Sequence, residues 1–448
     1  MLRFISQLPR RGLIPMLLCC LAIIGSCSAR NVQKGKVMLT YTRWGDPAEM
    51  ESTRELIAEF ERQNPDIEVR VDVVSWGQYW QKMKTATVTG SAQDVWFMSP
   101  AFVEEYASAG HLLDLMPFIK GDSSFNADDY FPGAFDDFSY AGEGDSLHPV
   151  PFGQGKLFAF TRDYNCSFLY YNRDHFDALG LPYPTNEWTW DDLVQTARKL
   201  TIDFNGDGVI DQWGYGGLNY TAFASAIGAQ PLDVKRHKST YSSEQMLKSI
   251  AFCQDMIYKY EVHPPPMIRI DETESFVTGK VSMTVAGIWN VRAYCRSEYR
   301  WDIAIVPTDA KERKYCAPGG GMGHCVYART AHPNEAWRLV KFLSSEAGQR
   351  ELARSGTSVP VLKKAAMSAG FLAGFDRPPR TSFPTIFQAL SGRSSRASYA
   401  RGYMEYTRRT SEIIDQVWRN QLAPADACRQ IDAAVDAVLA EQYGGAAQ

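Results

Sequence analysis

Residues 36–76 read KVMLTYTRWGDPAEMESTRELIAEFERQNPDIEVRVDVVSW, and their pattern decides the fold. Residues 36–42 form a short apolar run, which predicts a buried strand. The turn that follows places Asp46 as an N-cap and Pro47 at the first position of a helix. Two hydrophobic patterns come next, one with helical spacing and one that alternates: Met50, Leu56, Ile57 and Phe60, then Ile67, Val69, Val71 and Val73. The stretch therefore predicts a strand, a helix and a second strand.

The alternation of elements continues to residue 99. A helical pattern covers about residues 78–88, and the segment DVWFMS that follows predicts a third, fully buried strand. Strands that alternate with helices are typical of a parallel sheet covered by helices, and ligands bind such sheets beyond the carboxyl ends of the strands. The loops at that edge carry four candidate ligand-binding side chains: Arg43, Trp44, Trp76 and Ser99. A tryptophan at either position is also compatible with a place in the core.

The rest of the chain keeps the α/β pattern. GKLFAF and SFLYYN, at 155–160 and 167–172, are strand-like. In TNEWTWDDLVQTARKLT the spacing of Thr189 and Asp192 predicts a capping box at the start of a helix. Two further strands and two helical regions are expected at 279–291, 301–307, 333–343 and 410–440.

Length and charge limit the function classes. With 448 residues the chain is long enough for two domains. Its 45% hydrophobic and 22% charged residues are ordinary for a globular protein. The net charge of −4 argues against nucleic acid or anionic lipid as the main partner, since both require a basic surface.

The N-terminus predicts an export signal. Three arginines precede an apolar run at 13–25, which is shorter than the roughly 20 residues of a membrane-spanning helix but suits a secretory signal. The run ends in Ile-Gly-Ser-Cys27, which resembles a bacterial lipobox. We therefore expect a signal peptide at 1–26, lipidation of Cys27 and a tethered linker at 27–35, outside the cytoplasm. An uncleaved anchor helix and an ordinary signal peptide are the alternatives.

Six cysteines follow Cys27, without CxxC pairs or metal-ligand spacing: Cys166, Cys253, Cys295, Cys316, Cys325 and Cys428. An extracytoplasmic location permits disulfides. Cys316 and Cys325 flank a glycine-rich stretch that is able to fold back as a hairpin. Pairing of these two is one expectation, and buried thiols are the alternative.

No enzyme motif stands out. The sequence lacks a GxSxG elbow, HExxH, a Walker A loop and a dinucleotide fingerprint. Paired carboxylates for glycoside hydrolysis stay open, because their pairing is spatial.

The segment DFNGDGVID at 203–211 is the sharpest local motif. It follows the first nine positions of an EF-hand calcium loop, with these candidate ligands: Asp203, Asn205, Asp207, the Val209 carbonyl and Asp211. Gly214 stands at the twelfth position, where an EF-hand has a bidentate glutamate. A bound structural calcium and an Asx-rich turn are therefore both open.

Two loops in the second half carry further candidate binding residues. In GIWN, Gly287 allows backbone to approach a ligand, Trp289 presents an aromatic face, and Asn290 provides a donor and an acceptor. The segment PGGGMG at 318–323 exposes backbone amides, and a simple hairpin turn explains it equally well.

Four stretches carry a resemblance to one family over nearly the whole mature chain. They are IAEFERQNPDIEVRV, FLYYNRDHFDALGLPYPTNEWTWDDLVQTARKLT, GKVSMTVAGIWNV and NEAWRLVKFLSSEAGQ. Together they resemble the family-one extracellular solute-binding proteins of ABC importers that take up sugars, and the lipobox is consistent with this family.

The resemblance implies a two-lobed α/β fold of the periplasmic-binding-protein type II, each lobe a mainly parallel sheet flanked by helices. It places lobe one at 36–152 plus about 316–345, and lobe two at about 153–315 plus 346–448. Sugar is then held between the lobes, and these positions align with the cleft: Trp44, Trp76, Ser99, Trp289, Gly320 and Gly321.

The implied mechanism is capture without catalysis. Sugar faces stack on Trp44 and Trp289, and hydroxyls pair with Ser99, Asn290 and loop amides. Ligand favours the closed arrangement, which docks on a membrane permease. A monomer is expected that needs no cofactor and binds no nucleic acid.

Two rival functions remain. A secreted glycan hydrolase needs two carboxylates in the cleft about 5 to 10 Å apart. A peptide or anion receptor on the same fold predicts cleft arginine or lysine, and Arg43 beside Trp44 is compatible with that reading.

Overall fold

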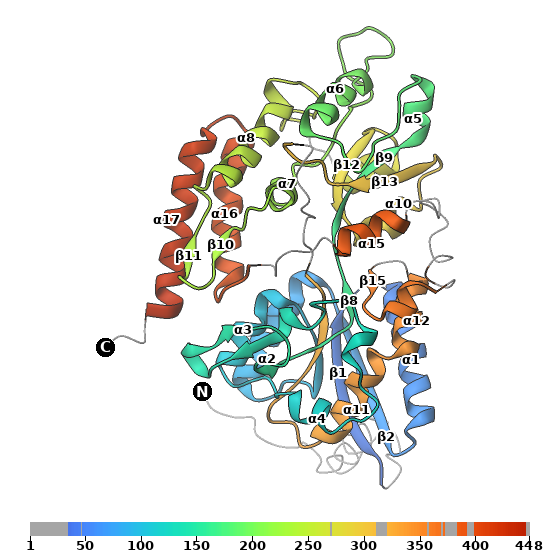
Figure 1. Ribbon diagram of the computed structural model, residues 1–448, viewed down its shortest axis with the longest axis vertical. Coiled ribbons are helices and arrows are strands. Elements are labelled where there is room, and N and C mark those ends of the chain that lie inside the picture. Colours follow the sequence, from blue (N-terminus) through green and yellow to red (C-terminus); the bar gives the residue numbers. More distant parts are fainter. Residues whose placement is uncertain are drawn as a thin grey trace, which may run out of the picture.

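The structure is a computed structural model that describes residues 35–45, 47–268, 271–310, 320–355, 358–368, 371, 383–391 and 398–444. The expected signal peptide at 1–26, the lipidated Cys27 and the linker up to residue 34 lie outside the described residues, as do Asp46 and Cys316. Two lobes lie end to end, the first at the bottom of Figure 1 and the second at the top. The two-lobed α/β fold agrees with the expectation from sequence.

The first lobe is built on a five-stranded sheet in the order β2-β1-β3-β14-β7. The strands are β1 (Val37–Trp44), β2 (Ile67–Val74), β3 (Val95–Met98), β7 (Phe160–Thr161) and β14 (Gly323–Val326). β1 runs parallel to β2 and β3, whereas β14 is antiparallel to β3 and β7. The helices α1 (Pro47–Gln63) and α2 (Trp76–Thr89) follow the first two parallel strands, as predicted, and α3 (Pro100–Ser108), which was not predicted, follows the third.

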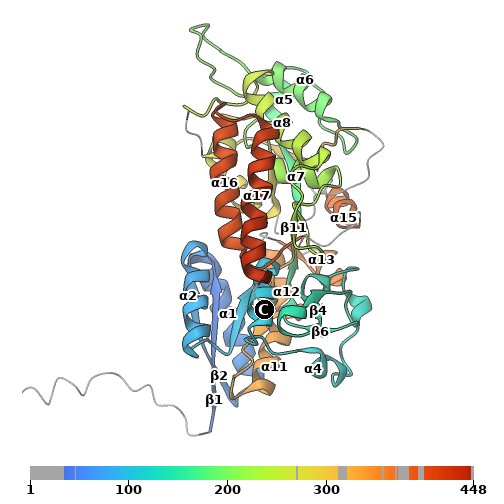
Figure 2. The same cartoon turned by 90° about the vertical axis from the view of Figure 1, so that its left-hand side faces the viewer.

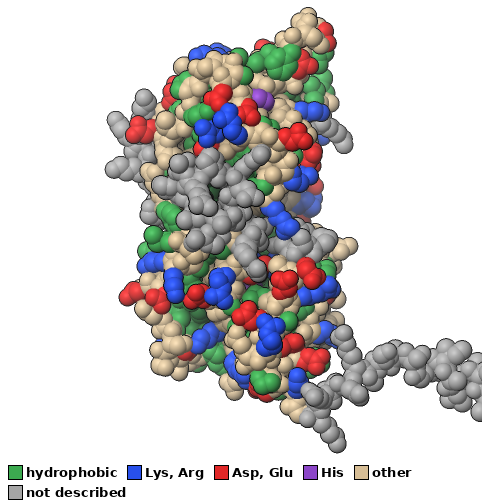
Figure 3. Space-filling view, turned by 90° about the vertical axis from the view of Figure 1, so that its right-hand side faces the viewer, with side chains coloured by type: hydrophobic (Ala, Val, Ile, Leu, Met, Phe, Trp, Pro, Cys, Tyr) green, Lys and Arg blue, Asp and Glu red, His purple; other side chains and the backbone are tan. Residues whose placement is uncertain are grey.

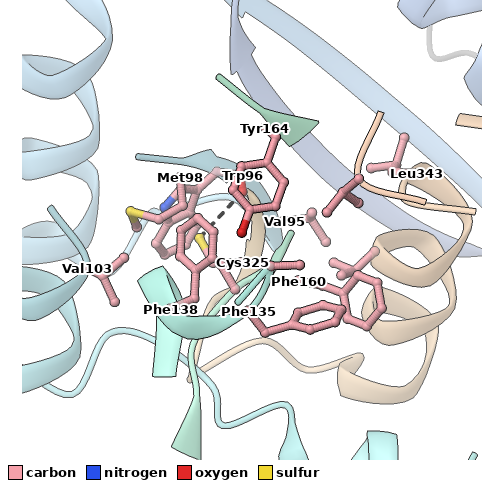
Figure 4. Close-up of a cluster of buried hydrophobic side chains, with 14 of the residues drawn as sticks. Val95, Trp96, Met98, Val103, Phe135, Phe138, Phe160, Tyr164, Cys325 and Leu343 are labelled. Carbon is pink, nitrogen blue, oxygen red and sulfur yellow. Dashed lines mark hydrogen bonds between the residues drawn. The ribbon is translucent and has the colours of Figure 1, made fainter. Parts of the chain in front are cut away.

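The hydrophobic pattern explains why these elements pack. Leu56, Ile57 and Phe60 of α1 are buried, and so are Ile67 and Val69 of β2. Figure 4 shows the centre of this core, where side chains from β3, β7 and β14 meet. Each fully buried large side chain of this kind contributes about 1.5–3 kcal/mol.

Cys325 lies inside that core as a free thiol. Its Sγ donates a hydrogen bond of 3.4 Å to the carbonyl oxygen of Trp96 (Figure 4). The buried-thiol alternative therefore holds for Cys325, and the expected disulfide with Cys316 is wrong.

The remaining elements of the first lobe are short or come from the later chain. They are α4 (Met116–Lys120), η1 (Ala127–Asp129), η2 (Asp136–Phe138), β4 (Ser139–Ala141), η3 (Gly144–Ser146), β5 (His148–Pro149), β6 (Lys156–Leu157), β8 (Asp163–Tyr164), α11 (Pro333–Leu343), α12 (Glu346–Ser355), β15 (Val359–Pro360) and α13 (Lys363–Ala366). α11 and α12 pack on α1, and β15 pairs with β8. On the face shown in Figure 3, basic and acidic side chains are interspersed over this lobe.

The second lobe has a three-stranded sheet in the order β12-β9-β13. The central strand β9 (Ser167–Asn172) is antiparallel to both β12 (Met283–Gly287) and β13 (Trp301–Ile305). The expectation of a mainly parallel sheet is therefore wrong for this lobe. The reason is that β9 leads away from the first lobe, whereas β12 and β13 return toward it, since Gly287 pairs with Ser167 at the start of β9.

Helices and two short strands surround this sheet. They are α5 (Arg173–Ala178), α6 (Trp190–Leu200), α7 (Tyr220–Ala226), β10 (Leu232–Asp233), β11 (Lys238–Ser239), α8 (Glu244–Tyr258), α9 (Glu272–Val277), η4 (Ile288–Asn290), α10 (Val291–Tyr294), α15 (Phe383–Ser391), α16 (Tyr403–Trp418) and α17 (Pro424–Tyr443). The predicted capping box of α6 is present, because Thr189 and Asp192 bond reciprocally. Figure 2 shows α16 and α17 side by side along one flank.

The strand pairings place the lobe crossings later in the chain than the sequence suggested. β7 still belongs to the first sheet, so the chain crosses between β8 and β9 rather than at residue 152. α12 packs on α1 and β15, so the chain beyond residue 346 stays in the first lobe before α15 contacts β13. The strands at the crossings are too short to show a hydrophobic period, so the sequence pattern did not mark the lobe boundaries.

Among the described residues, no helix has both the length and the apolar character that crossing a bilayer requires.

Candidate ligand-binding cleft

A cleft of about 920 Å³ lies between the lobes. Five sequence-predicted residues line it: Arg43, Trp44, Trp76, Ser99 and Trp289. Twelve further residues complete the described lining: Phe97, Ala101, Arg162, Asp163, Asn165, Arg292, Ala293, Arg296, Met322, Ser358, Tyr399 and Tyr403. Its size is that of a small-molecule site.

Tryptophans from β1 and α2 form the aromatic wall of the first lobe. Trp44 ends β1, and its ring centroid lies 4.8 Å from that of Trp76 and 4.2 Å from that of Phe97. Trp76 opens α2 and is 44% exposed. Ring contacts with its neighbours hold Trp44 in place, whereas part of the Trp76 ring is exposed. Together the two rings present a fixed apolar surface to the cleft.

Trp289 stands on the second lobe and is 54% exposed. It follows β12, whose direction back toward the first lobe brings this residue to the cleft. Gly287 supports it, since a Cβ on Gly287 would lie 2.2 Å from the Trp289 ring. The sequence interpretation of Gly287 as backbone that a ligand approaches is therefore wrong, because the indole occupies that space.

Ser99 has a structural task beside the cleft. It is the N-cap of α3, and its Oγ accepts a hydrogen bond from the Ala101 N–H at 3.4 Å. It is only 4% exposed, so most of its polar surface is already covered. A hydroxyl in this place still has a proton to donate.

Asn165 is a cleft residue that sequence reasoning missed. Its Nδ2 donates to Oδ1 of Asp163 and to the Gly320 carbonyl, both at 3.1 Å. These bonds fix the amide orientation, and Oδ1 is then buried without a partner among the described residues. A buried acceptor left unpaired costs about 1–3 kcal/mol, so this oxygen favours a ligand that brings a donor.

A buried ion pair lies at the first crossing. Arg162 Nη1 donates to Oδ2 of Asp163 at 2.8 Å, with side-chain exposures of 8% and 1%. Burial raises the pKa of Asp163, while Arg162, the Met322 N–H and Arg43 act against that rise. The same two arginines and, first of all, burial keep the pKa of His324 well below its usual value, so His324 is neutral behind the cleft wall.

Gly320 and Gly321, which the resemblance placed in the cleft, make contacts where the chain crosses between the lobes. Gly321 N–H donates to Oδ2 of Asp137 at 3.3 Å, and a Cβ on Gly321 would lie 2.3 Å from the Asp163 carbonyl oxygen. Gly320 accepts the bond from Asn165. Both lie next to the lining residue Met322 rather than in the described lining itself.

Arg43 and Asn290 differ in position. Arg43 is 5% exposed, and its guanidinium donates to the Trp44 carbonyl and to Oγ1 of Thr53, each at 3.0 Å. Asn290 lies at the start of α10, outside the described lining, and its side chain makes no capping bond. The predicted contact of Asn290 with ligand therefore stays a prediction.

A second contact joins the lobes beyond the cleft. Glu104 on α3 accepts hydrogen bonds from Tyr443 Oη at 2.6 Å and Arg401 Nε at 3.3 Å. Arg401 also donates to Oδ1 of Asp145 at 2.6 Å. The C-terminal segment of the second lobe is thereby tied to the first lobe.

The residues of the second-lobe wall follow one sequence signal. Trp289, Arg292, Ala293 and Arg296 are spaced i, i+3, i+4 and i+7, the spacing of one helix face, and they lie along η4, α10 and the turn that follows α10. The spacing alone was sufficient to group the two arginines with Trp289. No comparable signal marks Arg162, Asp163 or Tyr403, which only the crossings bring to the cleft.

The loop at 203–211 holds its carboxylates internally. Asp203 accepts hydrogen bonds from the N–H groups of Asn205, Gly206 and Gly208, and these bonds lower its pKa. Asp211 likewise accepts the Phe204 N–H at 2.8 Å. In the described part of the chain, no group of three or more His, Cys, Asp or Glu side chains is placed to hold a metal. The loop carboxylates are engaged in bonds within the loop, and calcium binding stays a prediction.

Known proteins resemble the chain in sequence and fold. A multiple sugar-binding protein of Streptococcus mutans is 20% identical over 352 residues, which cover 75% of this chain and 77% of that protein. A galactooligosaccharide-binding protein of Bacillus subtilis is 22% identical over 347 residues, 76% of each chain. An ABC substrate-binding protein of Listeria monocytogenes, solved in complex with cycloalternan, has a TM-score of 0.76 at 21% identity and covers 91% of this chain and 99% of that one.

Residues 44–350 match the family model of the bacterial extracellular solute-binding proteins. This range includes the second-lobe sheet, every strand of the first-lobe sheet except β1, of which it contains only Trp44, and most of the described cleft. The chain belongs to the bacterial extracellular solute-binding protein family.

Proposed function

We propose that the protein is the substrate-binding lipoprotein of an ABC importer and captures a sugar or oligosaccharide in the cleft. The observation that carries the proposal is the pair Trp76 and Trp289, two tryptophans from different lobes that are 44% and 54% exposed and line one cleft. Flat, weakly polar ring faces suit the C–H faces of a saccharide.

Capture depends on the populations of the open and closed arrangements of the two lobes. Each lobe contributes part of the wall, so a saccharide makes its full set of contacts only when the lobes are closed around it. The ligand therefore shifts the lobes toward closure in proportion to its extra contacts there. The orphan Oδ1 of Asn165 gains a hydroxyl donor in the same step.

Delivery and anchoring complete the proposal. The closed protein docks as a monomer on a permease in the membrane, whose ATPase subunits drive transport. Two acyl chains on Cys27 hold it at the membrane outside the cytoplasm, since two chains bury more CH₂ than one.

A hydrolase is the less favoured function. Among the described lining residues the one carboxylate is Asp163, and it is buried in an ion pair with Arg162. Glycoside hydrolysis uses two carboxylates about 5 to 10 Å apart across the scissile bond. We therefore propose that no bond in the ligand is broken.

The test is a thermal-shift screen over mono- and oligosaccharides with a peptide panel beside it. A ligand at 100 times its Kd adds about 2.7 kcal/mol to the free energy of unfolding and raises the melting temperature. Mass spectrometry of the recovered sugar follows. An altered sugar contradicts the binding-only function, and a response confined to peptides contradicts the saccharide ligand.

Calcium in the 203–211 loop is tested in the same screen. The prediction requires that calcium raises the melting temperature, that a chelator reverses the rise and that Asp203→Ala abolishes it. An unchanged melting temperature rejects it.

A further inference from the structure

We propose that a clamp between the lobes holds them in the arrangement in which both walls line the cleft. The clamp consists of Glu104 and Asp145 on the first lobe and Arg401 and Tyr443 on the second. The proposal goes beyond the proposed function, because it concerns how the lobes are held and not what they bind.

The second-lobe half of the clamp is firmly mounted. Arg401 directly precedes the paired helices α16 and α17, which pack on α8 of the second lobe. The next residue, Gly402, lies so close to α17 that a Cβ there would be 2.8 Å from Cγ1 of Val438. The Arg401 N–H donates to Tyr443 Oη at 3.0 Å, and the guanidinium group lies 4.3 Å from the centre of the Tyr443 ring. The arginine therefore moves with the second lobe.

The first-lobe half supplies two carboxylates. Glu104 lies on α3, three residues after the cleft residue Ala101. Its Oε1 accepts hydrogen bonds from Tyr443 Oη at 2.6 Å and from Arg401 Nε at 3.3 Å. Asp145 on η3 accepts a third bond, from Arg401 Nη1 at 2.6 Å. Two acids of one lobe thus face a single guanidinium group of the other.

Burial makes this contact sensitive to lobe position. The side chains of Glu104 and Arg401 are each 9% exposed, and hydrogen bonds between charged groups are stronger than neutral ones. Burial and the charge of Glu104 raise the pKa of Tyr443, so its hydroxyl keeps the proton that it donates. Separation of α3 from the start of α16 breaks all three bonds together. The bonds therefore favour the arrangement in which the two elements meet.

The clamp acts on the cleft through its neighbours in the chain. Tyr399 and Tyr403, two positions before and after Arg401, both line the cleft. The ring of Tyr403 lies 5.4 Å from that of Phe102, the first-lobe residue two positions before Glu104. Because Arg401 is bonded to the first lobe, the two tyrosines are held against that lobe as well. Glu104 is therefore a positioning residue for the cleft wall.

The experiment measures lobe position without a ligand, by double electron–electron resonance. Spin labels are attached through a noncanonical amino acid at Thr85 on α2 and Ser411 on α16, two exposed positions on different lobes, so the native thiols are not labelled. Wild type is expected to give one narrow distance distribution. Glu104→Gln and Arg401→Gln are expected to widen it roughly twofold, since the lobes then populate other arrangements.

Two further variants and a control keep the test specific. Tyr443→Phe keeps the aromatic ring beside Arg401 and removes one hydroxyl, so an intermediate widening is expected. Glu104→Gln/Arg401→Gln is expected to widen the distribution no more than Arg401→Gln alone, because the effects of residues in contact do not add. Arg338→Gln is the matched control, since Arg338 pairs with Asp66 at 2.7 Å within the first lobe. Circular dichroism checks that each variant is folded.

The outcomes separate the clamp from the proposed function. A broad distribution in wild type, unchanged widths in the clamp variants or equal widening in Arg338→Gln overturns the clamp and leaves saccharide capture standing. Failure of every saccharide to bind overturns saccharide capture and leaves the clamp standing. Any saccharide that wild type does bind is expected to bind Arg401→Gln several-fold more weakly, because fewer molecules have both walls in place. Unchanged affinity contradicts the link between the clamp and the cleft.

Discussion

Asp163 and Met322 hold two crossings of the chain together: the Met322 N–H donates to Oδ1 of Asp163 at 2.8 Å. Asp163 lies on β8 at the first crossing, and Met322 directly precedes β14 at the second. The same carboxylate binds Arg162 and Asn165. One buried side chain thus joins the backbone of both crossings.

Asp163→Asn is expected to destabilise the protein by about 3–5 kcal/mol, because it removes the carboxylate charge that pairs with the buried Arg162. Urea denaturation measures the loss. Asp415→Asn is the matched control, since the Asp415–Arg419 pair has the same 2.8 Å separation but is exposed, and such pairs contribute about 0–1 kcal/mol. Equal losses for the two variants contradict the assigned role of burial.

Trp289→Ala is expected to lower saccharide affinity at least tenfold and to leave the free energy of unfolding within about 0.5 kcal/mol, because the indole is largely exposed. Calorimetry and chemical denaturation measure the two quantities. Trp80→Ala provides the contrast, since Trp80 is buried and stacks on Phe102 at 3.6 Å. Its removal is expected to cost about 3–5 kcal/mol of stability.

Gly287→Ala is expected to weaken binding through Trp289. The added methyl would lie 2.2 Å from the present indole, so the ring must leave its place. A shift in tryptophan fluorescence and a several-fold loss of affinity are the expected results. Gly121→Ala is the control, because its methyl would meet the nearest atom at an ordinary 3.5 Å. Unchanged affinity and fluorescence contradict the supporting role of Gly287.

Acid is expected to destabilise the second lobe through His263. Burial lowers the pKa of this histidine from 6.5 to about 4. Its Nδ1 faces the Pro264 carbonyl at 2.7 Å and its Nε2 accepts the Gly217 N–H at 3.2 Å, an arrangement that requires the neutral ring. Between pH 6.5 and about 4 the unfolded chain binds the proton and the folded one does not, so stability falls as the pH falls.

The histidine's share is measured by comparing variants. Between pH 7.5 and 5.0, wild type is expected to lose about 2 kcal/mol more than His263→Asn. His148→Asn is the control, because His148 is exposed, and it is expected to follow wild type. Parallel pH profiles for all three proteins would falsify this assignment.

Local rules were sufficient for most single elements. The buried face of α1, the strand β2 and the capping box of α6 depend on residues within a few positions of one another, and the sequence predicted each of them. The edge that joins Trp44, Trp76 and Ser99 was also predictable, because parallel strands place their carboxyl ends together. The spacing of Trp289, Arg292 and Arg296 also indicates one shared face, but only Trp289 was among the expected cleft residues.

Long-range pairing decided the rest. The antiparallel direction of β9 depends on strands more than 100 residues away in the chain, which no local period records. The ion pair of Arg162 and Asp163 lies where two crossings meet only because Met322 of the second crossing bonds to Asp163. The tie between Glu104 and Arg401 spans 297 positions.

The amino-acid order alone determined which segments become helices and strands and which aromatic rings follow them, because helix caps and hydrophobic periods act over one or two turns. Only the tertiary structure decided that rings and guanidinium groups from two lobes line one cleft, and that the acid among them is buried at a crossing between the lobes. The interaction between two charges and the exposure of a side chain both depend on distances in space, and the crossings between the lobes set those distances.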